Sequence, residues 1–378
     1  MSENLTWVEI DSQALTYNFN QIRGAIGPQV LFMPVIKSNA YGHGMVEIAK
    51  IVSQAGADYL GVVNGDEALF LRSCSITTPI LVLSYYAKGQ IKDLIQQGVD
   101  LVVYNLETAK EISRVASNSN ITAKIHVKVD TGTSRLGVAM EDATDFIDLC
   151  SGLNMIEVTG VFTHFADSEN DDWSFTNEQI EKFRNLLFDL QKKGIKIPIP
   201  HAACSSATLA ATETHFSMVR IGISLYGLWA SEENKAIVQK KYPEFDLKPV
   251  LSWSARIIQI NSLAKGLSVG YGCSYKAKKD STIAVLPVGY NEGYSRLLSN
   301  KGFVLVKGKK CPVVGRVCMN LCMIDITNIP GVKVGDRVII IGKQGKNEIT
   351  ADQIATETNT INYEVVTRIN SQIPRIIV

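Results

Sequence analysis

Lys37 is the residue whose type and position first suggest chemistry. It ends a continuous apolar run, Val30 to Ile36, which is the pattern of a strand buried on both faces, and it leads into a loop that contains Gly42 and Gly44. Burial disfavours the charged form of lysine and lowers its pKa, which leaves a neutral amine available to form a Schiff base with a carbonyl. A lysine at a strand end can also extend its ammonium group into solvent. The spacing alone leaves both interpretations open.

Polar residues, and the pair Gly222 and Ile223, also stand at or just after the ends of several later apolar runs. They are Lys128, Asp130, Arg135, His164, His201, Ser205, Ser206, Arg220, Gly222 and Ile223. In a barrel of parallel strands such positions meet at one end, where active sites are found. Hydroxyl groups at the helix start after Cys204, together with Gly222, would suit a phosphate group. Serines at a helix start are more often simple caps, so this signal is weak by itself.

The segments that must position these residues alternate between strand-like and helix-like patterns. Eight β-rich runs can be counted: Val30 to Lys37, Tyr59 to Asn64, Ile80 to Tyr85, Asp100 to Asn105, Ile125 to Asp130, Ile156 to His164, Ile197 to Ala203 and Met218 to Tyr226. Amphipathic segments lie between them, and the longest, Glu178 to Lys193, is expected to begin after Thr176 as its N-cap. This alternation predicts an α/β fold with a (β/α)8 TIM-type barrel over residues 1–245. A doubly wound open sheet is the alternative, because a count of strands does not prove closure.

The pattern changes after about Glu244, where β-rich runs divided by glycine turns replace the helix-like segments. These runs are Leu251 to Ile260, Thr282 to Tyr290, Phe303 to Val306, Pro312 to Val317, Met323 to Ile326 and Arg337 to Ile341. Residues 246–378 are therefore predicted to form a second, mainly-β domain. Trp7 to Ile10 is also strand-like but comes too early for the barrel count, so residues 1–10 could pair with the C-terminal domain.

The overall composition excludes several classes of function. The 378 residues carry a net charge of +1, so no global field attracts nucleic acid or an anionic membrane. No run approaches the ~20 apolar residues of a membrane span, and the start of the chain lacks the pattern of a signal peptide, so we expect a cytoplasmic protein. The 7 cysteines form no C-x-x-C pair, which predicts neither a zinc site nor a disulfide framework.

Several motifs spread over essentially the whole chain carry a resemblance to a known family. They comprise residues 37–44 (KSNAYGHG), 128–132 (KVDTG), 135–137 (RLG), 163–166 (THFA), 219–223 (VRIGI), 269–272 (VGYG), 287–290 (PVGY), 315–319 (GRVCM) and 361–364 (INYE). With these motifs the chain resembles the alanine racemases, pyridoxal-phosphate-dependent enzymes of fold type III. The resemblance implies an isomerase that interconverts L-alanine and D-alanine, uses pyridoxal 5'-phosphate, and acts as a homodimer with shared active sites. It also implies the supply of D-alanine as a peptidoglycan precursor.

Two residues match the catalytic positions of that family. By the resemblance Lys37 binds the cofactor covalently and then acts as acid and base on one face of the substrate Cα, while Tyr271, contributed across a dimer interface, serves the other face. Racemisation needs two opposed proton handlers, because the planar carbanion must be reprotonated from the side opposite to the one that lost the proton. Without the resemblance, Tyr271 would be interpreted as a turn aromatic between two glycines.

Further matches concern the cofactor. Arg220 corresponds to the residue that faces the pyridine nitrogen, and since a guanidinium does not give up its proton, the ring would be a weaker electron sink than one paired with a carboxylate. The remaining matches are a histidine that orients other side chains, residues that bind the phosphate, and a tyrosine from the β domain. They are His164, which would orient Arg220 or Tyr271; Tyr41, Ser205, Gly222 and Ile223, which would bind the phosphate; and Tyr363, which would support the site.

Three matches concern the substrate. Arg135 and the backbone of Met319 correspond to the positions that recognise its carboxylate, for which the planar guanidinium is suited. Lys128 matches a lysine that is carbamylated in some members of the family. A carbamate would hold the Arg135 guanidinium in place, whereas an ammonium would repel it, so carbamylation of Lys128 is a hypothesis of the resemblance.

The chain departs from the family pattern close to the substrate positions. Thr133 and Ser134 replace a usual Met-Gly pair, Cys204 replaces a common Asn, Asn291 and Glu292 replace Ala-Asp, and Asn320 replaces an Asp. Polar changes at a small pocket can shift discrimination, so serine or a broader set of amino acids is an alternative substrate. A type III decarboxylase and a non-catalytic pyridoxal-phosphate carrier are further alternatives. Arg220 argues against the first, and the C-terminal β domain argues against the second.

Overall fold

The chain forms two compact units in a computed structural model that describes residues 4–378. The larger unit comprises Gln13–Ala40 and Met45–Lys248. The other unit comprises the N-terminal segment that ends at Ser12, the short stretch Tyr41–Gly44, and Pro249–Val378. The loop after Lys37 therefore contributes four residues to the second unit, although it lies between two parts of the first unit in sequence.

Eight strands form a closed ring in the larger unit. In order around the ring they are β2 (Leu31–Pro34), β3 (Leu60–Asn64), β4 (Ile80–Tyr85), β5 (Val99–Val103), β6 (Ala123–Asp130), β8 (Ile156–Phe162), β9 (Ile199–His201) and β10 (Met218–Ile221). β10 pairs in parallel with β2, and a bridge between Val35 and Gly61 joins β2 to β3. A bond of 3.0 Å from Ser217 N to Pro200 O joins β9 to β10. The predicted barrel is confirmed, and the open sheet is wrong.

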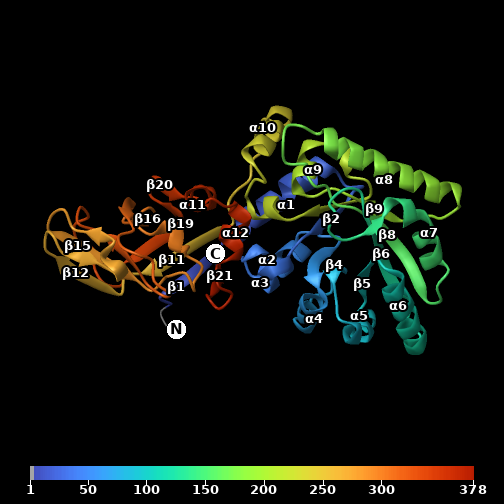
Figure 1. Cartoon of the computed structure of the whole chain (residues 1–378), viewed down its shortest axis with the longest axis horizontal. Helices are drawn as coiled ribbons and strands as arrows, with labels where there is room; N and C mark the ends of the chain where they lie inside the picture. The colour runs from blue at the N-terminus through green and yellow to red at the C-terminus, as the bar shows by residue number, and fades with distance from the viewer. Residues whose placement is uncertain (1–3) are drawn as a thin grey trace. The chain divides into compact units, whose positions relative to one another are not determined.

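Most residues of these strands are apolar, as expected where both faces of a strand are buried. All five residues of β5 are buried, for example, inside the ring or beneath the surrounding helices. Figure 1 shows helices outside the strands. They include α4 (Gly65–Ser73), α5 (Ile91–Gln96), α6 (Leu106–Ser119), α7 (Met140–Ser151) and α8 (Ser174–Lys192).

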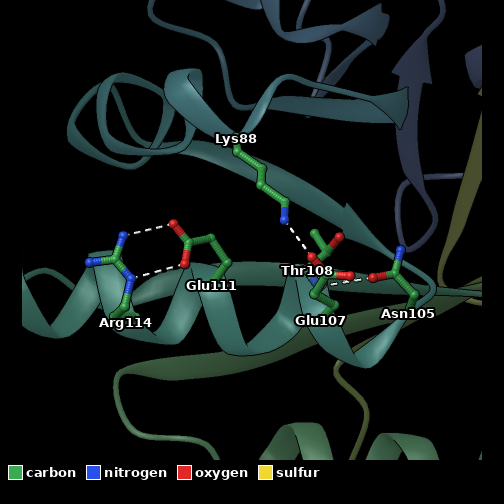
Figure 2. A network of polar contacts seen from close by, with 6 residues as sticks. All are labelled: Lys88, Asn105, Glu107, Thr108, Glu111 and Arg114. Atoms are coloured by element: carbon green, nitrogen blue, oxygen red, sulfur yellow. Dashed lines mark hydrogen bonds and ion pairs between the residues drawn. The ribbon is translucent and has the colours of Figure 1, made fainter.

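Helix α6 shows how local sequence sets a helix boundary and what its exposed face carries (Figure 2). The Asn105 side chain accepts a hydrogen bond from Thr108 N at 2.8 Å, which caps the first turn. Its C-terminus ends at Asn120, whose φ of 52° lies in the left-handed region that asparagine tolerates. On the exposed face, Lys88 pairs with Glu107, and Arg114 pairs with Glu111.

The start of α8 differs from the prediction. The helix begins at Ser174, four residues before the predicted Glu178, and Thr176 lies within its first turn. The Thr176 hydroxyl donates to Asp167 O at 3.0 Å, so it stabilises the preceding loop and does not cap the helix. Composition alone does not distinguish these two uses of a threonine.

The second unit is mainly β, as predicted. One of its sheets has the order β17 (Lys309–Pro312), β16 (Phe303–Val306), β19 (Arg337–Gln344), β11 (Leu251–Arg256), β1 (Thr6–Ile10) and β21 (Arg375–Ile377), with β20 (Asn347–Ile349) paired to β19. Another has the order β12 (Gln259–Leu263), β15 (Ser281–Leu286) and β18 (Cys322–Asp325). The short strands β13 (Ser268–Val269) and β14 (Tyr275–Lys276) form a pair of their own. The strand-like segment Trp7 to Ile10 thus belongs to this unit, where β1 pairs with β11.

Two details of this unit differ from the prediction. Two helices, α11 (Ala351–Thr358) and α12 (Asn362–Thr367), follow the last of the predicted β-rich runs, and the sequence had not indicated them. Residues 312–317 do not form a strand beyond Pro312, and Val313 makes only an isolated bridge to Ile324. Within residues 4–378, no helix is both long enough and apolar enough to cross a bilayer.

Candidate active site

Lys37 follows strand β2 and opens a left-handed backbone segment, α2 (Lys37–Tyr41). Ser38, Asn39, Ala40 and Tyr41 have φ angles of 55°, 53°, 53° and 53°. A left-handed turn costs about 1–2 kcal/mol per L-residue, because Cβ approaches the following carbonyl oxygen. The sequence predicted an ordinary glycine-containing loop here, whereas four consecutive residues that are not glycine adopt the strained conformation. Such a turn requires bonds from its surroundings to persist.

Hydrogen bonds from the turn itself and from two helices hold this left-handed turn. Ala40 N donates to Ile36 O at 2.8 Å, and the Asn39 side chain accepts from Met45 N at 2.9 Å. Ser38 N donates to Oε1 of Glu67 at 2.7 Å. The last of these comes from helix α4, so it ties the turn to a different βα unit of the barrel.

The amine of Lys37 lies in a partly buried, cationic environment. Burial lowers its pKa, the positive charge of Arg135 lowers it further, and the carboxylate of Glu67 acts in the opposite direction. The two lowering effects together outweigh that of Glu67, so the pKa of Lys37 lies below that of a free lysine. A larger neutral fraction makes the amine a better nucleophile and a better proton acceptor.

Lys128 and His164 lie in the same electrostatic environment. Burial, followed by the charges of Arg220, Arg135 and Lys37, lowers the pKa of Lys128 to about 8. Burial and the same set of cations lower the pKa of His164 well below its usual value, so its ring is neutral at pH 7. The structure thus brings together five of the predicted residues, which come from the ends of four different strands.

Arg220 is buried and held as a hydrogen-bond donor at the end of β10. Its Nη2 donates to the backbone oxygens of Thr163 and Ala202, both at 2.8 Å, and contacts Nδ1 of His164 at 3.2 Å. Its Nη1 lies 2.9 Å from Nδ1 of His201. Burial lowers the pKa of Arg220 to about 10, which leaves the guanidinium charged at neutral pH.

A chain of buried side chains extends from Arg220 through the barrel. A guanidinium has no acceptor, so Nδ1 of His201 must accept from Arg220, and the proton of His201 must lie on Nε2. That Nε2 is 3.0 Å from Nδ1 of His126, which must therefore accept in turn. Nε2 of His126 then carries the proton and faces Oδ2 of Asp100 at 3.4 Å, and Tyr59 donates to the same oxygen at 3.2 Å. Arg220 thus fixes the tautomers of both histidines, and the chain ends at a carboxylate.

The ends of β9 and β10 meet at Ser205 and Gly222. Gly222 N donates to the Ser205 hydroxyl oxygen at 2.9 Å, which leaves the hydroxyl hydrogen available for another acceptor. Beside them, the Ser168 hydroxyl contacts Sγ of Cys204 at 3.2 Å and the Ser206 hydroxyl at 2.7 Å. Ile223 follows Gly222 and opens a 3-10 turn. Two of the predicted phosphate ligands are therefore in direct contact.

Asp130 organises the loop that presents Arg135. Its Oδ1 accepts from Gly132 N at 2.9 Å and from Thr133 N at 2.8 Å, and its Oδ2 accepts from Arg135 N at 3.2 Å. Burial raises the pKa of Asp130, but the backbone donors outweigh it and hold the pKa below its usual value. Arg135 is itself exposed, while its backbone is tied to the end of β6. The departures Thr133 and Ser134 lie inside this loop.

The other predicted residues belong to the second unit. Tyr271 is 73% exposed on a 3-10 turn between Gly270 and Gly272, whose φ angles are 71° and 69°. Met319 is exposed, and its carbonyl oxygen accepts from Asn291 N at 2.9 Å. Tyr41 and Tyr363 form a tilted ring pair with centroids 6.1 Å apart. These four residues are thus assigned to the β unit and do not belong to the barrel.

The barrel site fits an anionic cofactor that reacts with an amine. Lys37 supplies the amine, and Arg220, Lys128 and Arg135 all act electrostatically on His164, so cations surround one neutral ring. Arg220 and Lys128 are buried, which costs free energy, and a phosphate or carboxylate group would offset that cost. A barrel lysine of lowered pKa within such a cluster is the arrangement of a pyridoxal-phosphate enzyme of fold type III.

Comparison with known proteins agrees with this class. Residues 10–229 match the family model "Alanine racemase, N-terminal domain", and residues 250–377 match "Alanine racemase, C-terminal domain". The alanine racemase of Methanococcus maripaludis is 43% identical over 371 residues, which cover 98% of each chain. The solved alanine racemase of Clostridium difficile 630 has a TM-score of 0.94 and 34% identity, covering 100% of this chain and 97% of that one. The chain belongs to the alanine racemase family.

A third comparison bears on the cofactor. The alanine racemase of Bartonella henselae, solved with covalently bound pyridoxal phosphate, has a TM-score of 0.86 and 27% identity, and each chain is fully covered. Membership of the family confirms the enzyme class expected from the sequence, an isomerase of the amino-acid racemase type that depends on pyridoxal phosphate.

The structure adds residues to the site that the sequence did not single out for any role. Glu67 contacts the turn after Lys37, and His126 and Asp100 continue the chain behind Arg220. His126 and Asp100 lie inside β-rich runs, where they interrupt otherwise apolar residues. That interruption is a signal that could have found them, because a buried strand rarely carries an unpaired polar group. Glu67 had no such signal, since acidic residues are common in the first turn of a helix.

Proposed function

We propose that this chain interconverts L-alanine and D-alanine in a two-base reaction with Lys37 on one face of the substrate Cα and Tyr271 of the partner subunit on the other. Bound pyridoxal phosphate would withdraw electrons from the substrate and so acidify its Cα hydrogen. Nζ of Lys37 would take or give the proton on one face. The phenolic oxygen of Tyr271 of the partner subunit would do so on the other. The observation that carries the proposal is the partly buried Lys37 amine, whose pKa is lowered by burial and by Arg135.

Three further groups would hold and tune the cofactor. Ser205, with the backbone N–H groups of Gly222 and Ile223, would bind its phosphate, supported by Tyr41 and Tyr363. Arg220, held in place by His201 and His164, would donate to its ring nitrogen. Because the guanidinium stays charged, it would donate without transferring its proton, which limits electron withdrawal and favours simple proton exchange at Cα.

The substrate carboxylate would be recognised by Arg135 and by the backbone of Met319. We propose that Lys128 is carbamylated in the active protein. Its pKa of about 8 supports this, since the reaction with carbon dioxide requires the neutral amine, and the cations Arg220, Arg135 and Lys37 would stabilise the anionic product. Intact mass measurement tests this proposal, and a mass equal to the unmodified chain would contradict it.

We also propose that the active form is a homodimer in the cytoplasm. Tyr271, Tyr290, Met319 and Leu321 are large and exposed on the second unit, which supports a surface that a second copy covers. A two-fold axis would then complete two sites at once. All seven cysteines are free, which supports a reducing compartment. In that setting the enzyme would supply D-alanine as a peptidoglycan precursor.

Chiral product analysis tests the proposed reaction. The purified, pyridoxal-loaded protein is incubated with L-alanine, L-serine or L-lysine, and the D-enantiomer and carbon dioxide are measured. We expect D-alanine as the main product and no carbon dioxide. Carbon dioxide from lysine would indicate a decarboxylase, D-serine formed faster than D-alanine would correct the substrate, and bound cofactor with no product would indicate a carrier.

Two variants test the assignment of the bases. Tyr271→Phe keeps the ring but removes the phenolic proton, so we expect racemisation to fall while cofactor binding stays intact. Lys37→Ala should abolish covalent cofactor binding, measured by absorbance after gel filtration. Full racemase activity in Tyr271→Phe would contradict the two-base scheme.

A further inference from the structure

Glu67 accepts a hydrogen bond from the left-handed turn that follows Lys37, and it reaches the turn from a different βα unit of the barrel. It is the third residue of α4, after the N-cap Asn64, and its own N–H donates to the Asn64 side chain at 2.9 Å. Its Oε2 accepts from Val63 N at 2.8 Å, and its Oε1 accepts from Ser38 N at 2.7 Å. One carboxylate thus connects the end of β3, the start of α4 and the residue next to Lys37.

This geometry requires the ionised carboxylate. Both oxygens accept backbone N–H groups, and a protonated acid would turn one of these acceptors into a donor. The position in the first turn of α4 also favours a negative charge, because the N-terminal end of a helix carries a partial positive charge. Burial raises the pKa of Glu67 above that of a free carboxyl group, and the two N–H donors and Lys37 oppose that rise only in part.

The left-handed turn is strained, so it needs hydrogen bonds such as the one from Ser38 N to Glu67 to keep its conformation. Four consecutive residues at φ between 53° and 55° would relax towards the right-handed region if released, and Lys37 at the start of the turn would be reoriented. The internal Ala40 to Ile36 bond would be lost in the same relaxation. The Asn39 bond to Met45 acts further along the turn, so Ser38, next to Lys37, depends on Glu67.

We propose that Glu67 is a positioning residue for the Lys37 amine: its carboxylate maintains the left-handed turn through Ser38 N–H and supplies a negative charge beside an amine that otherwise faces cations. Arg135 and Glu67 act on this amine directly, and the groups that share its environment are Lys128, His164, Arg220 and Asp130. Among them, only Glu67 raises the proton affinity of Lys37. The inference rests on the proposed role of Lys37, but it concerns the chain without cofactor as well.

The test compares Glu67→Gln with Asp66→Asn in the protein freed of cofactor. Asp66 is the neighbouring residue of α4, is exposed, and bonds the Gln90 side chain, so Asp66→Asn removes the same charge without touching Ser38. Hydrogen exchange of the peptide that contains residues 37–41 is followed by mass spectrometry. We expect at least tenfold faster exchange of the Ser38 amide in Glu67→Gln and no change in Asp66→Asn.

A second readout measures the proton affinity of Lys37 directly. Competitive labelling of the Lys37 amine with acetic anhydride across a range of pH gives its pKa in each variant. Loss of the Glu67 charge should lower that pKa, because the carboxylate no longer stabilises the ammonium form. Glu67→Asp keeps the charge, but its side chain is too short to reach both N–H groups. In this variant the Ser38 amide should exchange faster than in the wild type, while the pKa of Lys37 should change less than in Glu67→Gln.

A rescue variant separates positioning from a general loss of structure. Glycine adopts the left-handed region without the Cβ penalty, so Ser38→Gly should restore part of the exchange protection that Glu67→Gln removes. In the loaded enzyme, Glu67→Gln should lower kcat for alanine more than tenfold and change KM less than twofold. Equal effects of Glu67→Gln and Asp66→Asn, or no change in exchange and in the pKa of Lys37, would overturn the proposal. If the wild-type chain racemises nothing while both readouts shift as expected, the proposed function fails and the role of Glu67 stands.

Discussion

The barrel unit carries two polar networks built from similar groups in opposite surroundings. At the exposed face of helix α6 (Figure 2), Glu107 of the helix pairs with Lys88 of the 3-10 turn Lys88–Gln90, and the side chains of Lys88 and Glu107 are 66% and 79% exposed. Behind Arg220, by contrast, His201 and His126 are fully buried, and Asp100 is almost so. Water can replace any partner lost on α6. No water can replace a partner lost behind Arg220 without a space being opened for it.

The two networks have similar bond lengths, but they differ in the free energy that is lost when a partner is removed. The buried bond from Arg220 to His201 is 2.9 Å long, and the exposed bond from Arg114 Nε to Glu111 is also 2.9 Å long. When an exposed pair breaks, both groups form hydrogen bonds with water instead. A buried group that loses its partner has no such replacement, so its desolvation cost is no longer offset. The buried chain also imposes directions, because each acceptor determines which nitrogen of the next ring is protonated.

The largest effect is expected from His201→Ala. This change leaves Nη1 of Arg220 and Nδ1 of His126 without their partner and opens a cavity where the ring stacks on Phe162, with centroids 4.7 Å apart. Removing one member of a buried charged network costs about 3–5 kcal/mol. Urea unfolding of the variant measures the loss. A loss below about 1 kcal/mol would show that the chain contributes no more than an exposed pair.

Gly160→Ala should have a smaller but clear effect on the same chain. Gly160 lies opposite His126 in the ladder of β6 and β8, and a Cβ there would lie 2.2 Å from Nδ1 of His126 and 2.8 Å from Ile199 O. Overpacking of this kind costs about 1–3 kcal/mol in unfolding free energy. Gly24→Ala is the matched control, since its Cβ in helix α1 (Ser12–Ile26) meets nothing within 4 Å and should stabilise by about 1 kcal/mol. Equal changes in the two variants would contradict the close fit around His126.

The two networks also differ in how far the sequence predicts them. The barrel and the position of Lys37 follow from local patterns, because strand-length apolar runs and the residues at their ends are visible in the chain itself. The bonds of His201 to Arg220 and of Glu67 to Ser38 join residues 19 and 29 positions apart, in different βα units, so they depend on the closure and register of the barrel. The left-handed turn had no local signal, since Ser38, Asn39, Ala40 and Tyr41 include no glycine. Thr176 shows the same limit, because its hydroxyl bonds a loop that only the folded chain brings near.

Acidification should weaken the folded protein through the buried histidines. Burial lowers the pKa of both His201 and His164 well below 6.5, so that between the native and the unfolded pKa the unfolded chain binds protons that the native chain does not. This contribution to stability is complete above about pH 6.5 and is lost as the pH falls. Each histidine should reduce the unfolding free energy by about 1.4 kcal/mol between about pH 7.5 and 5.5. Urea unfolding at these pH values measures the slope, and an identical slope in His201→Gln would contradict the assignment to His201.

Asn105→Ala tests the one member of the α6 network that bonds the backbone. Its side chain accepts from Thr108 N at 2.8 Å, and its loss leaves a helix N–H without an intrahelical partner. Loss of such a cap costs about 1 kcal/mol. The urea midpoint of Asn105→Ala should decrease less than that of His201→Ala in the buried chain and more than that of Lys88→Ala in the exposed ion pair. No decrease would show that water replaces this cap as readily as it replaces an exposed pair.

The smallest effect is expected from Lys88→Ala on the exposed face. Lys88 pairs only with Glu107 among the bonds drawn in Figure 2, and both side chains stay hydrated when the pair breaks. We therefore expect no measurable change in the urea midpoint, at low or high salt. Glu107→Gln should behave in the same way, since it removes the other partner. A clear loss in either variant would mean that the exposed pair contributes to stability as a buried one does, and that solvent exposure is not what separates the two networks.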